Sequence, residues 1–134
     1  MTRENIDSTA ERLIEFLETG EDPGGLFTED VFCDFTMPRW RLQARGRGPV
    51  IELRRRGHPT PGKVPRFRVD PTPTGFVMEL EETWVEGNEH WYCREMLRAE
   101  LQGEAIALLS VYCTGDWDQK QCEKHSREVQ LLCP

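Results

Sequence analysis

The chain has 134 residues and a mass of 15.6 kDa, so we expect a single domain over residues 1–134. It carries 17 Lys and Arg against 24 Asp and Glu, and the net charge of -7 disfavours binding to nucleic acid or to an anionic membrane through overall charge. Hydrophobic residues make up 37% of the chain, enough for a core, and no apolar run predicts a secretion signal or membrane span, so we expect a cytoplasmic protein.

The cysteines are odd in number, which argues against a secreted disulfide framework and predicts reduced thiols. Metal-like spacing occurs only at Cys122-x-x-His125, which offers two ligands where a structural zinc ion needs four. The sequence therefore predicts no metal site, and without nucleotide-binding signatures it predicts no cofactor. The five cysteines are Cys33, Cys93, Cys113, Cys122 and Cys133.

The first predicted element is a helix. Ser8 and Glu11 form a capping box, apolar residues follow at helical spacing, and Gly20 is a suitable stop. A first strand over about residues 31–37 then ends at Pro38. The apolar stripe of the helix comprises Ala10, Leu13, Ile14 and Leu17.

A two-turn helix with Pro49 at its first position is predicted next, closed by Gly57 and with three arginines in its last turn. The following stretch holds five prolines, which predicts a rim loop or an edge strand around Phe67 and Val69. These prolines are Pro59, Pro61, Pro65, Pro71 and Pro73.

Three long alternating runs, over residues 74–86, 89–101 and 105–113, predict sequential antiparallel strands joined by tight turns. Residues 116–129 predict a C-terminal helix capped by Asp116 or Asp118. The pattern indicates an α+β fold: N-terminal helices packed on one side of a strongly curved, mostly antiparallel sheet, with a cone-shaped cavity between them and an extra C-terminal helix.

This order of elements, with the segments Leu26–Phe32 and Glu104–Tyr112, resembles the nuclear transport factor 2-like (NTF2-like) superfamily and, within it, the bacterial SnoaL-like proteins. The resemblance implies a cone cavity that hosts polyketide cyclases, epoxide hydrolases, steroid isomerases and dehydratases, and also non-catalytic members. It further implies a homodimer that pairs through the outer face of the sheet. Where family members often carry an Asp, two residues beyond Tyr112, this chain has Thr114, and its nearest acid is Asp116.

Glu95 is the most informative candidate for catalysis. It shares strand parity with Trp91, Cys93 and Leu97, so regular alternation buries its carboxyl group on an apolar face. A buried carboxyl group must be paired or have a raised pKa, and a raised pKa suits a general acid or base near neutrality. The alternatives are a structural pair with an arginine or a bulge that turns Glu95 outward.

His90, Tyr92 and Arg94 lie on the opposite parity of the same strand. If that face lines the cavity, these residues form a cluster of a base and proton donors, and Glu95 leaves the site. The two assignments exclude each other in a regular strand.

The other candidates each have a structural alternative. Tyr112 is a proton donor or a wall residue, and Asp116 is a catalytic orienter or a helix cap. His125 is a base or a packing residue on the C-terminal helix. Flat aromatic and apolar side chains suit a polycyclic or aromatic ligand, although such residues are ordinarily core. The candidate substrate-binding residues are Trp40, Trp84, Trp91, Trp117, Phe76, Met78 and Arg94.

Between Arg39 and Arg68 the chain has ten basic residues and one acid, Glu52. This segment either pairs with acids of the protein or forms an entrance that attracts an anionic or carrier-tethered substrate.

Two functions follow. The first is a cofactor-independent acid/base enzyme (an isomerase, cyclase, dehydratase or hydrolase) acting in biosynthesis on a hydrophobic substrate such as a polyketide-like or aromatic molecule. The second is a non-catalytic cavity protein that binds a hydrophobic ligand or a partner enzyme.

Overall fold

The computed structural model describes residues 1–134 and contains three helices and one six-stranded sheet. Helix α1 spans Arg3–Thr19, α2 spans Arg47–Gly57 and α3 spans Gln119–Glu128. The strands are β1 (Phe27–Met37), β2 (Trp40–Arg45), β3 (Gly62–Thr72), β4 (Gly75–Glu86), β5 (Glu89–Gln102) and β6 (Ala105–Cys113). No helix is both long and apolar enough to cross a lipid bilayer.

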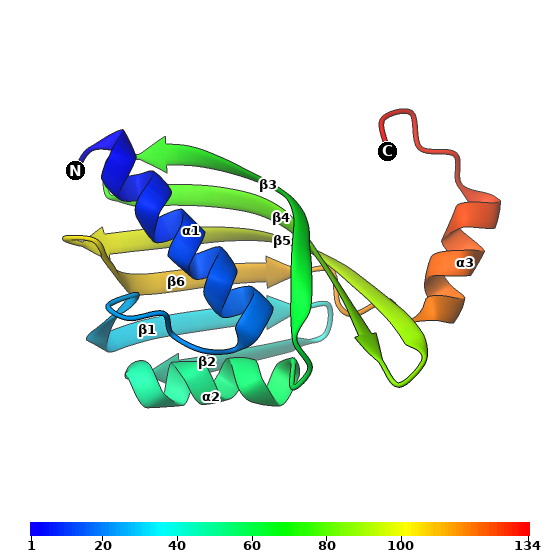
Figure 1. Ribbon diagram of the computed structural model, residues 1–134, viewed down its shortest axis with the longest axis horizontal. Helices are drawn as coiled ribbons and strands as arrows, with labels where there is room; N and C mark the ends of the chain where they lie inside the picture. The colour runs from blue at the N-terminus through cyan, green and yellow to red at the C-terminus, as the bar shows by residue number, and fades with distance from the viewer.

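The sheet has the order β2-β1-β6-β5-β4-β3, and only the β1–β6 pair is parallel. Figure 1 shows this sheet curling around α1, which lies across its concave face, while α2 lies along the β1–β2 side. The predicted α+β cone with a mostly antiparallel curved sheet is confirmed. The predicted strands over 74–86, 89–101 and 105–113 are β4, β5 and β6.

The core lies between α1 and the inner face of the sheet. Alternate residues of β4 and β5 enter it because successive side chains of a strand point to opposite faces. The apolar stripe predicted on α1 is confirmed, since Ala10, Leu13 and Leu17 are buried and Ile14 packs against them. Phe76 and Met78, expected to bind substrate, are fully buried members of this core.

Several element boundaries differ from the expectations. Helix α1 begins at Arg3, where the Thr2 side chain accepts a hydrogen bond from the Asn5 amide, so Ser8 lies inside the helix rather than at its cap. Gly20 ends the helix as predicted, in a left-handed conformation with φ 78°. Helix α2 is longer than two turns and begins before Pro49. Asp118, and not Asp116, caps α3 by accepting from the Gln121 amide.

Strand β2 was not predicted, although its six residues alternate apolar and polar side chains; the run is short and none of its residues is buried. The proline-rich stretch forms β3, an edge strand, which was one of its two predicted forms. An edge position tolerates proline since one side of the strand needs no hydrogen-bond donors.

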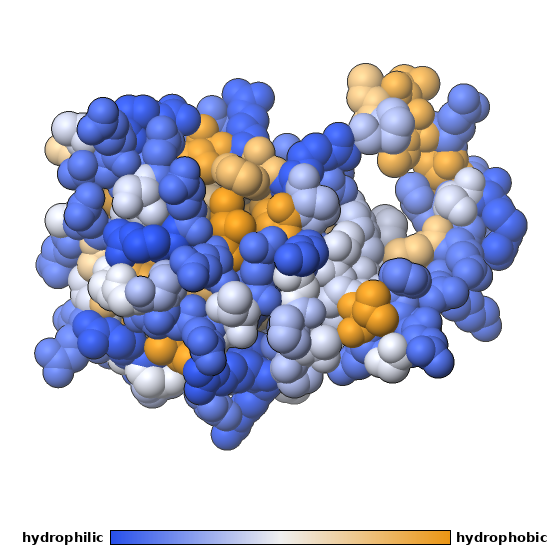
Figure 2. All heavy atoms as spheres, in the orientation of Figure 1, coloured by the Kyte–Doolittle hydropathy of each residue, from blue (hydrophilic) through white to orange (hydrophobic).

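Helix α3 stands apart from the body, as Figure 1 shows at the right. It has no buried residue and is tied to the sheet by a bridge between Trp117 and Tyr92. The segment after α3 exposes Leu131 and Leu132, and hydrophobic atoms cover this tail at the upper right of Figure 2.

Candidate active site

Polar side chains gather inside the sheet at the end of the molecule where α1, α2 and β6 end, on the right of the body in Figure 1. The inner face is apolar elsewhere, but here β4 and β5 each place one glutamate on it. We call this group the polar cluster. Its members are Arg54 and His58 from α2 and its end, Glu82 from β4, Cys93 and Glu95 from β5, Cys113 from β6 and Asp116 from the loop that follows.

Glu82 and Glu95 are almost completely buried, with exposed fractions of 3% and 6%. Both lie on the inner face because they keep the parity of Leu80 and Leu97, respectively, on neighbouring strands. The predicted burial of Glu95 on the inner face is confirmed. A carboxyl group buried to this extent is either functional or paired with another group.

Arg54 joins Glu82 to helices α1 and α2. Its guanidinium donates to both carboxylate oxygens of Glu82, at 3.2 Å for Nη1–Oε2, and from Nη2 to the carbonyl oxygen of Leu17 at 2.6 Å. The guanidinium therefore satisfies Glu82 with a bidentate ion pair and also binds the last turn of α1. One cation thus faces two buried carboxyl groups.

The two glutamates differ in protonation because of this asymmetry. Burial raises the pKa of Glu95 well above its ordinary value, and the charge and hydrogen bond of Glu82 raise it further. Burial also acts to raise the pKa of Glu82, but the hydrogen bond from Glu95 and the charge of Arg54 outweigh it and lower that pKa. These opposite directions favour Glu95 as the member of the pair that carries a proton and Glu82 as the ionised member.

His58 and Asp116 flank the pair toward the surface. His58 Nε2 lies 3.8 Å from Asp116 Oδ1. Burial and the charge of Arg54 lower the pKa of His58 to about 4, so its imidazole is neutral at pH 7. Burial and the nearby charge of Glu82 raise the pKa of Asp116.

Two indoles form the aromatic part of this region. Trp84 and Trp91 are directly paired across β4 and β5, and their rings stack with centroids 6.2 Å apart. The His58 ring meets the Trp84 ring edge to face at 4.7 Å. Trp91 Nε1 is buried without a hydrogen-bond partner.

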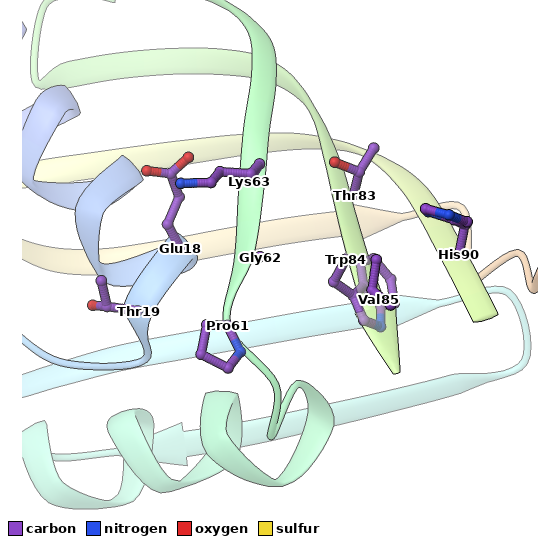
Figure 3. A pocket seen from close by; sticks show the side chains of 9 residues that line it. All are labelled: Glu18, Thr19, Pro61, Gly62, Lys63, Thr83, Trp84, Val85 and His90. Carbon is purple, nitrogen blue, oxygen red and sulfur yellow. The ribbon is translucent and has the colours of Figure 1, made fainter. Parts of the chain in front are cut away.

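A surface hollow of about 430 Å³ lies beside Trp84, among the last turn of α1, the start of β3, the end of β4 and the start of β5 (Figure 3). It is lined by Glu18, Thr19, Pro61, Gly62, Lys63, Thr83, Trp84, Val85 and His90. Glu82 and Glu95 do not line it, whereas Trp84 lines it and also contacts His58 of the polar cluster.

The outer face of the sheet holds the alternative candidates. His90 and Arg94 are exposed there, and the hydroxyl group of Tyr92 donates to Glu81. Tyr112 is 61% exposed on the same face. The inner-face assignment therefore applies, and these four residues lie apart from Glu95.

The remaining candidates are dispersed. Trp117 and His125 pack against each other, with ring centroids 5.2 Å apart, at the base of α3. Trp40 is 65% exposed at the start of β2. The structure thus brings Glu95, Asp116, Trp84 and Trp91 together, places His90 with Trp84 in the lining of the hollow, and leaves the other predicted site residues elsewhere.

Sequence reasoning missed Arg54, His58 and Glu82. Glu82 had a usable signal, because it lies between Leu80 and Trp84 on the parity of an apolar face, as Glu95 does on its own strand. Arg54 was hidden in a run of three arginines that the helix C-terminus already explains. His58 carries no signal in the sequence.

Five of the nine arginines between Arg39 and Arg68 form ion pairs with acidic residues of this chain. Besides Arg54 with Glu82, the pairs are Arg41 with Asp34, Arg56 with Glu52, Arg66 with Glu81 and Arg68 with Asp70. This arrangement favours the structural interpretation of the segment over an entrance for anions.

No protein-family model matches the chain, and no curated protein matches it. Solved structures do resemble it. An NTF2-like protein from Anabaena variabilis superposes with a TM-score of 0.69 at 20% identity, covering 86% of this chain and 95% of that one.

Two further solved structures with a similar fold are an epoxide hydrolase and a biosynthesis-related protein. An LEH-like epoxide hydrolase from M. tuberculosis gives a TM-score of 0.65 at 16% identity, covering 84% of each chain. A phenazine biosynthesis-related protein from Pseudomonas aeruginosa gives 0.62 at 17% identity, covering 83% of this chain and 82% of that one. The chain has the NTF2-like fold, as the resemblance in its sequence implied.

Proposed function

We propose that the protein is a cofactor-independent acid/base enzyme of the cytoplasm, of the isomerase, cyclase, dehydratase or hydrolase type. Its substrate is a small hydrophobic molecule, such as a polyketide-like or aromatic compound. Glu95 donates a proton to the substrate, and the negative charge of Glu82 keeps that proton on Glu95 until then.

The observation that carries this proposal is the pair of buried glutamates with a single arginine. Two carboxylates and one guanidinium leave one negative charge in a region of low dielectric, and a proton on Glu95 removes it. A carboxylic acid that keeps its proton at neutral pH can act as a general acid there.

The neighbours of the pair supply the other parts of such a reaction. Neutral His58 and Asp116, with Nε2 and Oδ1 3.8 Å apart, form a base and its orienting partner at the outer side of the cluster. Trp84 and Trp91 offer flat apolar surface for a ring. The epoxide hydrolase with a similar fold supports hydrolysis as one member of the proposed range.

A second candidate function is non-catalytic binding of a hydrophobic ligand or a partner enzyme. It is favoured by the burial of both glutamates and by the 430 Å³ hollow, whose lining includes neither of them. In this case the glutamate pair serves only the fold.

Glu95→Gln separates the two functions because it keeps the shape of the side chain and removes the acid. Native mass spectrometry of the purified protein first identifies any co-purified ligand class. A panel of aromatic epoxides, cyclic enones and hydroxyketones is then followed by NMR in deuterated water. We expect turnover or isotope exchange with the wild type, its loss in Glu95→Gln with ligand affinity retained, and no change in Glu79→Gln on the outer face.

Turnover by Glu95→Gln at the wild-type rate contradicts a role for Glu95 as the acid. Binding of panel compounds without any turnover by the wild type supports the second candidate instead.

The homodimer expected from the sequence belongs to this proposal as well. Met96 and Tyr112 are exposed on the outer face of adjacent strands, β5 and β6, among charged residues. A partner copy on this face would bury on the order of 800 Å² per protomer. Sedimentation equilibrium at micromolar concentration should give about twice 15.6 kDa, and a 15.6 kDa species contradicts the dimer.

A further inference from the structure

Two cysteines and Glu95 meet at one point of the inner face of β5 and β6. Cys93 and Glu95 are two residues apart on β5, so their side chains share a face, and Cys113 of β6 is the direct partner of Glu95. The two sulfur atoms and a carboxylate oxygen of Glu95 all lie within 4.8 Å of one another. Three side chains capable of binding a metal ion are thus held on two paired strands rather than on loops.

The spacing of these atoms fits a tetrahedral ion. With Zn–S of about 2.3 Å and Zn–O of about 2.0 Å, a tetrahedral zinc ion separates a sulfur from an oxygen ligand by about 3.5 Å. Cys93 Sγ lies 3.5 Å from Oε1 of Glu95. Small movements of side chains alone would close the set around an ion.

The surroundings supply the outer contacts that such sites need. The amide of Gly115 donates to Cys113 Sγ at 3.4 Å, a contact that orients the sulfur. Oε2 of Glu82 lies 4.0 Å from Cys93 Sγ; it accepts from Arg54 and has a second lone pair with which it could be the fourth ligand. Cys113 is only half-buried, so an ion can reach the set from the side of the loop that carries Asp116.

We propose that Cys93, Cys113 and Glu95 form a binding site for one thiophilic divalent cation of the Zn²⁺ class, with Glu82 or water in the fourth position. Two thiolates select such an ion over Mg²⁺ and Ca²⁺, which prefer oxygen ligands. The inference goes beyond the proposed function and does not depend on it. The ion and the Glu95 proton are alternative occupants of the same carboxyl group, so the metal-loaded protein lacks the acid.

Cobalt is a spectroscopic probe of this site, since Co²⁺ bound to thiolates in a tetrahedral site gives strong near-ultraviolet charge-transfer absorption. The full chain is reduced, freed of metal with a chelator and titrated with Co²⁺. We expect the absorption to saturate at one equivalent and Zn²⁺ to abolish it.

Variants assign the ligands. Cys93→Ser and Cys113→Ser should each lose the stoichiometric absorption. The double variant Cys122→Ser/Cys133→Ser is the control, because both of its cysteines lie outside the polar cluster, and it should retain the absorption. Glu95→Gln keeps both thiols and should weaken Zn²⁺ binding at least about tenfold in competition with a chromophoric chelator.

Thermal melts identify any cysteine variant that fails to fold. In that case the Zn²⁺ affinity of Glu95→Gln tests the proposal. The proposal is overturned by a wild type without stoichiometric absorption, by absorption that persists in folded Cys113→Ser, or by unchanged Zn²⁺ affinity in Glu95→Gln. Its loss in the Cys122→Ser/Cys133→Ser control also overturns it.

Discussion

Arg54 is the residue on which the buried charges depend. It is the cation that pairs with Glu82, and both side chains are nearly inaccessible to water, with exposed fractions of 11% and 5%. An ion pair in such a position contributes little relative to an apolar pair, but losing one partner leaves an uncompensated charge.

Arg54→Met should therefore lower the free energy of unfolding by about 3 to 5 kcal/mol in urea denaturation. The double variant Arg54→Met/Glu82→Gln should recover much of that loss because it removes the stranded carboxylate. Arg56→Met, which breaks the exposed pair with Glu52 on the same helix, should leave stability nearly unchanged. A loss in Arg56→Met equal to that in Arg54→Met would contradict this explanation.

His58 makes stability depend on pH in the acid range. Its pKa is about 4 in the folded protein, below the ordinary value of about 6.5, so the unfolded chain binds the proton more tightly between these values. The stability that neutral His58 contributes is present above pH 6.5 and is lost as the pH falls toward 4.

We expect the free energy of unfolding of the wild type to fall more steeply from pH 6.5 to pH 4 than that of His58→Gln, by on the order of 2 to 3 kcal/mol. Urea denaturation at a series of pH values measures both slopes. Parallel curves for the two proteins would show that His58 is not held neutral.

At the scale of elements, the long strands and α1 were predictable from sequence because each satisfies a strong local rule. Strands β4 and β5 alternate over more than ten residues, and α1 has an apolar stripe ended by Gly20. Strand β2 and the start of α1 were missed or misplaced because short, partly exposed strands and helix N-termini carry weak local signals.

Gly75 shows how closely the elements approach. A Cβ added there would lie 2.0 Å from the carbonyl oxygen of Ala99 on the neighbouring strand, so the backbone must move to admit any side chain. Gly75→Ala should cost about 1 to 3 kcal/mol of unfolding free energy. Gly48→Ala in α2, where no atom lies within 4 Å, should be neutral or stabilise by up to about 1 kcal/mol in the same denaturation experiment. Equal effects at the two positions would contradict the close approach of β4 and β5.

At the scale of the molecule, the fold explains why only part of the site could be predicted. Strand parity placed Glu95 inside, because that rule is local to β5. The pairing of Glu95 with Glu82 and Arg54 depends on the packing of α2 against the curled end of the sheet, which joins residues far apart in the sequence. Tyr112 and His90 were reasonable candidates by residue type, but their strand parity is that of the outer face, and His125 lies on α3.

The proposed function depends on a proton that stays on Glu95 at neutral pH while Glu82 is ionised. Infrared spectroscopy of the metal-free protein at pH 7 tests this protonation state directly, because a protonated carboxyl group has a carbonyl stretch distinct from that of a carboxylate. We expect this band in the wild type and in Glu79→Gln, and its absence in Glu95→Gln. A wild-type spectrum without the band, or a band that survives in Glu95→Gln, would contradict the account.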